Sequence, residues 1–174
     1  MLFRSDSLSL SGSSQFTTEA KNIPQDITDS KGNILLYANG GKTGRAGVIN
    51  LNSSNPRDLS ISFLDPGSTI NAKTDTTGNG GTINLGTSNR SLTISGPGTI
   101  TAETNGLAQG SGNGGDINLF GSSISLSKGA ILTARTTGNG KGGKINLDAD
   151  SLSLSGSSQF TTEAKNIPHD ITDS

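Results

Sequence analysis

The feature that most constrains the fold is a repeated run, Ile-Asn-Leu, which follows glycine-rich residues four times. It occupies residues 49–51, 83–85, 117–119 and 145–147, so successive copies begin 34, 34 and 28 residues apart. A second alternating run follows each copy, at residues 59–61, 92–94, 124–126 and 152–154. A third run follows in turn, at residues 70–72, 100–102, 132–134 and 160–162. Three short runs in a fixed order, repeated along the chain, predict a solenoid.

The alternation within each run predicts β-strands with one buried face. In a strand, successive side chains point to opposite sides, so the two apolar residues of Ile-Asn-Leu face inward and the asparagine faces outward. In the third run, Ile100, Ala102 and Thr104 are expected on the inner side. We therefore predict an all-β parallel β-helix with three short strands per rung and about five rungs. An antiparallel sandwich is disfavoured, because two-residue hairpin turns are not found at the junctions.

Glycine pairs are expected to form the corner before the first strand of each rung. They are Gly80-Gly81, Gly114-Gly115 and Gly142-Gly143. We expect a positive φ here, since glycine adopts that conformation most easily. The segment 32–47 is harder to place. It contains the apolar run Asn33-Ile34-Leu35-Leu36-Tyr37-Ala38, which fits either an additional first strand or an insertion strand, and the pattern does not choose between them.

Composition excludes several classes of function. The net charge is −1, and the chain has one tyrosine, five phenylalanines and no tryptophan, so neither a basic surface nor a stacking platform for nucleic acid is expected. The absence of cysteine removes disulfides, thiolate metal sites and cysteine nucleophiles. No apolar run is long enough to predict a transmembrane segment. The start of the chain does not resemble a signal peptide.

A longer repeat relates the two ends of the chain. Residues 7–30 and 151–174 have the same sequence except that Gln25 is replaced by His169. We interpret residues 1–174 as a single β-helix repeat segment, a fragment of a longer array whose targeting signal lies upstream. A rung at the end of a solenoid needs a capping element, because it leaves strand edges unpaired.

Stacking of equivalent residues predicts columns on the outer faces. Asn50, Asn84, Asn118 and Asn146 form one column; Ser60, Thr93, Ser125 and Ser153 form a second; Asn71, Thr101, Thr133 and Thr161 form a third. Amides or hydroxyls one strand apart can hydrogen-bond as ladders that hold the register. A fourth column, Glu19, Lys73, Glu103, Arg135 and Glu163, alternates in charge, and Asp116 beside Lys144 repeats this pairing on the first face. We expect these charges to control register more than stability.

Candidate catalytic and metal-binding groups do not form a pattern. Asp116 follows glycines as in calcium-binding repeat proteins, but its equivalents are Val48, Thr82 and Lys144, so a column of carboxylate ligands is not expected. Asp148 and Asp150 lie two residues apart and fit a solvated turn better than a catalytic pair. His169 replaces a glutamine between the two copies, which argues against a catalytic triad. No catalytic, cofactor-binding or metal-binding residue is predicted.

The ordered unit Gly-Gly-x-Ile-Asn-Leu, Ser-Leu-x-Ile/Leu-Ser and Gly-x-Ile-x-Ala-x-Thr resembles the repeats of filamentous-haemagglutinin-like exoproteins, most of all the cyanobacterial ones. The clearest stretches are residues 115–138 and 143–164. The resemblance implies a right-handed parallel β-helix that is exported by two-partner secretion through an outer-membrane transporter. It also implies an adhesin that is secreted or located at the outer cell surface. It also implies glycans or host and matrix surfaces as partners. The family's amino-terminal secretion domain is not found in this sequence, so no transporter-recognition residue is assigned.

Two classes of function remain open. The first is an adhesin-like stalk or display surface without catalysis. The shallow polar faces that the pattern predicts are consistent with this class. The second is a non-catalytic part of a polysaccharide-binding or polysaccharide-degrading β-helix protein. A carboxylate or basic cluster on one outer face would favour the second class. The outward positions carry asparagine, serine and threonine instead, which favours the first class.

Overall fold

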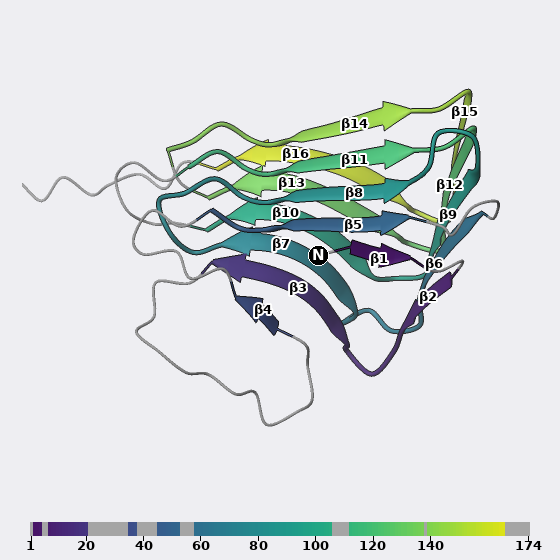
Figure 1. Cartoon of the computed structure of the whole chain (residues 1–174), viewed down its shortest axis with the longest axis horizontal. Helices are drawn as coiled ribbons and strands as arrows, with labels where there is room; N and C mark the ends of the chain where they lie inside the picture. The colour runs from purple at the N-terminus through teal and green to yellow at the C-terminus, as the bar shows by residue number, and fades with distance from the viewer. Residues whose placement is uncertain are drawn as a thin grey trace, which may run out of the picture.

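The computed structural model describes residues 2–4, 7–20, 35–37, 45–52, 58–105, 112–137 and 139–165. These residues form strands joined by turns and bends, and none of them lies in a helix. The strands belong to three sheets in which every pair of neighbours is parallel. The predicted parallel β-solenoid with three strands per rung is confirmed (Figure 1).

The first strand of each rung belongs to sheet A, the second to sheet B and the third to sheet C. Sheet A contains β1 (Leu2–Arg4), β5 (Val48–Asn52), β8 (Thr82–Gly86), β11 (Asp116–Phe120) and β14 (Lys144–Asp148). Sheet B contains β2 (Ser7–Leu10), β6 (Leu59–Phe63), β9 (Ser91–Ser95), β12 (Ser123–Ser127) and β15 (Ser151–Leu154). Sheet C contains β3 (Gln15–Ala20), β7 (Thr69–Thr74), β10 (Thr99–Thr104), β13 (Ile131–Thr136) and β16 (Gln159–Ala164), with β4 (Leu35–Tyr37) at its edge.

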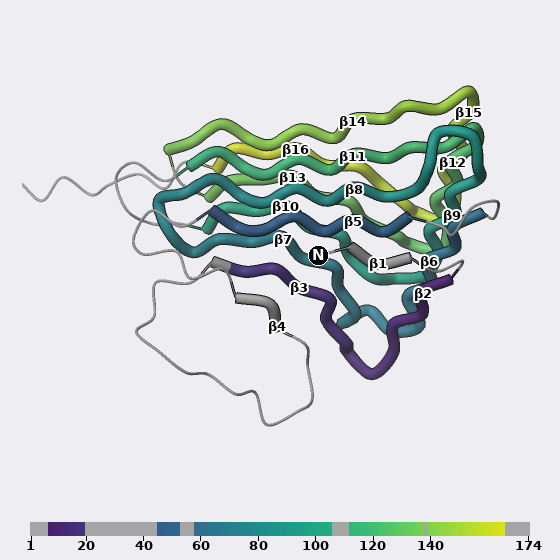
Figure 2. The backbone as a smooth tube through the Cα atoms, viewed as in Figure 1, coloured from purple at the N-terminus to yellow at the C-terminus, as the bar shows by residue number. Residues whose placement is uncertain are grey.

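The rungs follow one another in chain order. Apart from β4, each strand pairs only with its equivalents in the adjacent rungs, which gives five successive sets of three strands in the described part of the chain. The colour in Figure 2 accordingly runs from purple at β2 and β3 to yellow at β16 across the stack. Contacts between residues that are far apart in the sequence therefore hold the fold together. An isolated rung would have no adjacent rung to pack against.

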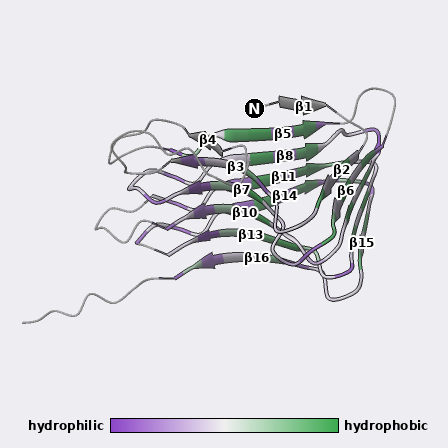
Figure 3. Cartoon of the chain, turned by 90° about the horizontal axis from the view of Figure 1, so that it is seen from below, coloured by the Kyte–Doolittle hydropathy of each residue, from purple (hydrophilic) through white to green (hydrophobic). Residues whose placement is uncertain are grey.

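The core lies between the three sheets and is formed by the inward positions of the strands. From β8 to β13 every inward apolar side chain is fully buried: Ile83, Leu85, Leu92, Ile94, Ile100, Ala102, Ile117, Leu119, Ile124, Leu126, Leu132 and Ala134. Figure 3 shows hydrophobic colour along the sheet A strands and hydrophilic colour at the C-terminal ends of the sheet C strands. The core continues at those ends with Thr104 and Thr136, which are also buried. The Thr104 hydroxyl donates to the carbonyl oxygen of Asn113, and the Thr136 hydroxyl donates to that of Gly112. Both buried hydroxyl groups therefore have a hydrogen-bond partner.

The corner glycines are required for a reason other than the predicted one. Gly81, Gly115 and Gly143 do not have a positive φ, so that expectation is wrong. Instead, a Cβ at Gly115 would overlap the carbonyl oxygen of Gly81, and a Cβ at Gly143 would overlap that of Gly115. Successive rungs thus approach too closely at this corner for any side chain.

The strand in segment 32–47 belongs to sheet C and not to the first face. β4 pairs in parallel with β3, with Leu35 opposite Thr17 and Tyr37 opposite Glu19. It lies on the side of β3 that faces away from β7, as Figure 1 shows. Of the two placements left open by the sequence, the insertion strand is therefore the correct one.

Candidate functional site

An asparagine ladder runs along the outer face of sheet A. The strand pairing places Asn50, Asn84, Asn118 and Asn146 side by side. The amide nitrogen of each donates to the side-chain oxygen of the preceding one, at 2.6 Å for Asn84 to Asn50 and 2.7 Å for each of the next two steps. The predicted amide column is therefore confirmed, and it forms a continuous chain of hydrogen bonds.

The ladder leaves hydrogen-bonding capacity facing outward. An asparagine side chain carries two N–H donors and two acceptor lone pairs. Asn84 and Asn118 each use one donor and one acceptor within the ladder. Their side chains are only partly buried, so the second N–H and the second lone pair are available to water or to a ligand.

The two other polar columns are in register but do not form ladders. Thr93 lies opposite Ser60 and Ser125, and Thr101 lies opposite Asn71 and Thr133. Among the described residues, no hydrogen bond joins successive hydroxyls of these columns. Serine and threonine side chains are too short to bridge strands about 4.8 Å apart, whereas an asparagine amide reaches its neighbour.

The alternating charges on sheet C are also in register. Glu103 lies between Lys73 and Arg135, and Glu163 follows Arg135. Ion pairs join Glu19 to Lys73 at 3.8 Å and Glu103 to Arg135 at 3.0 Å. The hydrogen bond that the Arg135 guanidinium donates to Glu103 raises the pKa of Arg135 above its ordinary value, against the opposing effect of partial burial.

The carboxylates of this column are more buried than the sequence suggested. The side chains of Glu19 and Glu103 are 8% and 6% exposed, whereas those of Lys73 and Arg135 are 32% and 42% exposed. The interpretation as exposed surface pairs is therefore incomplete, because a nearly buried carboxylate depends on its cation much more than an exposed one does.

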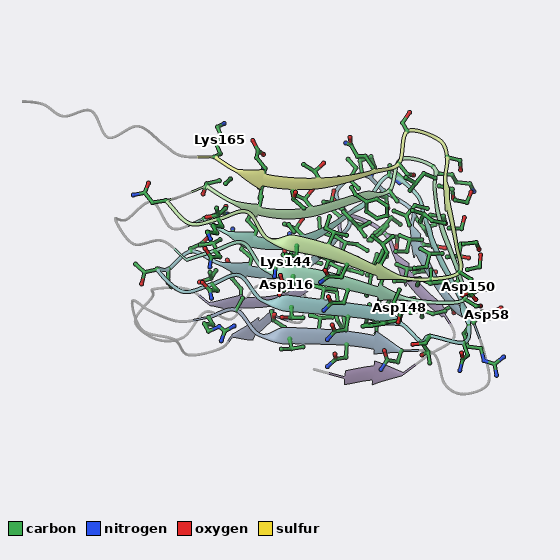
Figure 4. All side chains as sticks on the ribbon, turned by 90° about the horizontal axis from the view of Figure 1, so that it is seen from above. Asp58, Asp116, Lys144, Asp148, Asp150 and Lys165 are labelled. Atoms are coloured by element: carbon green, nitrogen blue, oxygen red, sulfur yellow. The ribbon has the colours of Figure 1, made fainter. Side chains whose placement is uncertain are left out.

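A charged groove of about 350 Å³ lies at the corner between sheets C and A. Its charged residues are Arg45, Asp116, Lys141 and Lys144. Asp116 and Lys144 are neighbours in register (Figure 4), but this pair is not among the ion pairs of the described residues. The backbone N–H groups of Gly80, Gly114 and Asp116 already donate to carbonyl oxygens of adjacent rungs. These three N–H groups are consequently not available to bind an anion.

A groove of about 400 Å³, whose described lining residues are all uncharged, lies on sheet A beside the asparagine ladder. We call it the amide groove; it is lined by Asn50, Asn52, Asn84, Gly86, Thr87, Ser88 and Phe120. The sequence pattern predicted polar and charged residues at the outward positions, and Phe120 was not identified among them. The signal was nevertheless present. Phe120 directly follows the inward Leu119, so the alternation places it on the outer face.

The carboxylates weighed as a catalytic pair lie on different elements. Asp148 ends β14 in register with Phe120, whereas Asp150 lies in the turn before β15 and its N–H donates to Ser122. Figure 4 shows both at the same edge of the solenoid as Asp58, where the strands of sheet A end and the chain turns toward sheet B. Among the described residues, no group of three or more histidine, cysteine or acidic side chains could hold a metal ion. His169 lies outside the described residues.

Comparison with known proteins gives no relative. No protein-family model, no curated protein and no solved structure matches the chain significantly. In the described part of the chain, no helix is long and apolar enough to cross a lipid bilayer.

Proposed function

We propose that this chain is a segment of an adhesin-like stalk or display surface, secreted or held at the outer cell surface. The observation that carries the proposal is the asparagine ladder, which joins four rungs through side chains as well as through the backbone. A solenoid linked in this way is suited to act as a stiff rod with a regular polar face. The resemblance of its repeats to those of filamentous-haemagglutinin-like exoproteins supports the same setting, including export through a partner transporter in the outer membrane.

Surface labelling tests the proposal. Antibodies raised against the purified chain are expected to label intact cells that produce the protein, and brief external protease treatment should remove the signal. An antibody against a cytoplasmic protein serves as the control and should label only permeabilised cells. Labelling of the chain only after permeabilisation would contradict a surface location.

Within this function, the segment could either bind a ligand or serve only as a spacer. A binding array distinguishes these two roles. The purified chain is applied to immobilised glycans and matrix proteins. Saturable binding that is lost on Asn118→Asp or Thr133→Asp would identify a display surface, since both residues lie on outer faces. Silence across the array would identify a spacer.

A further inference from the structure

Phe120 is an aromatic side chain in an unusual position for this chain. Phe63 is buried in the core, and Phe16 and Phe160 pack against it. Phe120, in contrast, stands on the outer face of sheet A, partly exposed, while the adjacent Leu119 is fully buried. A partly exposed aromatic ring supplies a flat apolar surface that is suited to contact with a ligand.

Gly86 leaves the position opposite Phe120 on the adjacent strand without a side chain. Phe120 lies opposite Gly86 on β8 and opposite Asp148 on β14. Gly86 has a φ of +85°, and a Cβ there would overlap the carbonyl oxygen of Phe120. The backbone therefore requires glycine at this position, and the amide groove lies on the glycine side of the ring.

The polar lining of the amide groove selects for hydroxyl groups. Asn50 and Asn84 are joined in the ladder, and Asn84 keeps one free N–H and one free lone pair. A hydroxyl group can donate and accept at the same time, so it can satisfy both. A carboxylate or phosphate would only accept, and an ammonium group would only donate. Among the described residues, none of the side chains that line the groove is charged, so these side chains do not favour a charged ligand.

We propose that the amide groove binds a segment of a neutral polysaccharide. One sugar ring lays its C–H face on Phe120, and its hydroxyls bond to Asn50 and Asn84. The hydroxyls of Thr87 and Ser88 lie at the exposed rim of the groove and complete the polar contacts. Neighbouring amides are about 4.8 Å apart, a spacing that hydroxyls of one ring or of adjoining rings can span. This inference rests on the proposed display function and assigns it a ligand class.

Titration of the full chain with defined polysaccharides tests the inference. The probes are oligosaccharides of dextran, mannan, galactan and cellulose, compared with oligogalacturonate and dextran sulfate. Binding is followed by calorimetry and by the side-chain amide signals of ¹⁵N-labelled protein. At least one neutral probe should bind saturably and shift the asparagine amide signals, with little response to the anionic probes.

Variants assign the binding to the groove. Phe120→Ala should weaken binding roughly five- to tenfold, whereas Phe120→Trp should retain it. Ser88→Glu places a charge at the exposed rim and should weaken binding without touching the core. Leu64→Ala is the matched control, because it removes an apolar side chain that is 63% exposed and lies outside the groove. Circular dichroism checks that each variant keeps its β-structure.

Several outcomes would overturn the inference: no neutral probe binds, Phe120→Ala and Ser88→Glu bind like the parent chain, or only anionic probes bind. The last outcome would direct attention to the charged groove. Failure of this ligand assignment can be distinguished from failure of the proposed function. Cells that label at the surface with a chain that binds no neutral polysaccharide contradict the ligand assignment alone, whereas saturable binding by a chain that never reaches the surface contradicts the location alone.

Discussion

Arg135 and Glu103 are 32 residues apart in the sequence, yet the Arg135 Nη2 lies 3.0 Å from the Glu103 Oε1. The contact joins β13 to β10 across one step of the stack. It is asymmetric, because the carboxylate is nearly buried and the guanidinium is almost half exposed. A shift of one residue between these strands would place Glu103 opposite an apolar or hydroxyl side chain. The pair therefore specifies the register of sheet C.

Glu103→Lys should destabilise the chain strongly, and most of all at low salt. The new cation would lie between Lys73 and Arg135, so three positive charges would follow one another along the stack. We expect a loss of roughly 2 kcal/mol or more in the free energy of unfolding, since the site is nearly buried. Thermal unfolding at low and high salt provides the measurement.

The salt dependence identifies the cause. Charges are screened over about 30 Å at 0.01 M salt and over about 3 Å at 1 M salt, so the loss should shrink at high salt. Glu163→Lys is the control: Glu163 is exposed and its only described strand neighbour in this column is Arg135, so a smaller loss is expected. Equal losses at both salt concentrations would show that packing, and not charge, is responsible.

Asn84→Ala should destabilise the chain by about 1–3 kcal/mol, because it removes two hydrogen bonds of the ladder. Asn146→Ala removes one hydrogen bond from an exposed residue and should cost about half as much or less. Urea unfolding of the two variants measures the difference. A loss for Asn146→Ala equal to that for Asn84→Ala would mean that the ladder does not act as a connected chain.

The repeat pattern predicted the three faces and the register of the columns correctly. The reason is physical: side chains alternate with period two, so Ile83 must be buried if Asn84 is outside, and identical residues in successive rungs then fall into line. The same pattern could not place β4. Its position depends on a free edge of β3, which is a property of the assembled sheet and not of residues 35–37.

The repeat pattern also did not predict a shift of register between β2 and β6. Residues 8–10 repeat residues 152–154, and Leu152 lies opposite Ile124, which in turn lies opposite Leu92. Following the repeat, Leu8 would therefore lie opposite Leu59, because Leu59 is the partner of Leu92. The structure pairs Leu8 with Ile61 instead. A shift of two residues keeps every side chain on its own face, so alternation cannot detect it.

Gly115→Ala should be far more damaging than Gly129→Ala. At Gly115 a Cβ would overlap backbone atoms of the adjacent rung, so the two rungs would have to separate, at a cost of roughly 3 kcal/mol or more. At Gly129 the nearest atom lies at 3.8 Å, and only the φ of +84° opposes a side chain, which costs about 1–2 kcal/mol. Urea unfolding compares the two. Similar losses would contradict close approach as the reason for the corner glycines.

Gly98 should be coupled energetically to Phe63, because the two residues share one space in the core. Phe63 is 2% exposed, and a Cβ at Gly98 would overlap its ring. Gly98→Ala alone should therefore cost about 1–3 kcal/mol. In the Phe63→Ala background the ring atoms that the new methyl group would overlap are absent, so the second substitution should cost less.

A double-mutant cycle measures this coupling from the unfolding free energies of four proteins. We expect the double variant to be more stable than the sum of the single losses predicts, by at least about 0.5 kcal/mol. Phe160→Ala is the matched control, since this partly buried aromatic packs on the core from β16, while Gly98 precedes β10. Its effect should add to that of Gly98→Ala without coupling. Additive losses in both cycles would show that Gly98 is required by its backbone and not by the ring of Phe63.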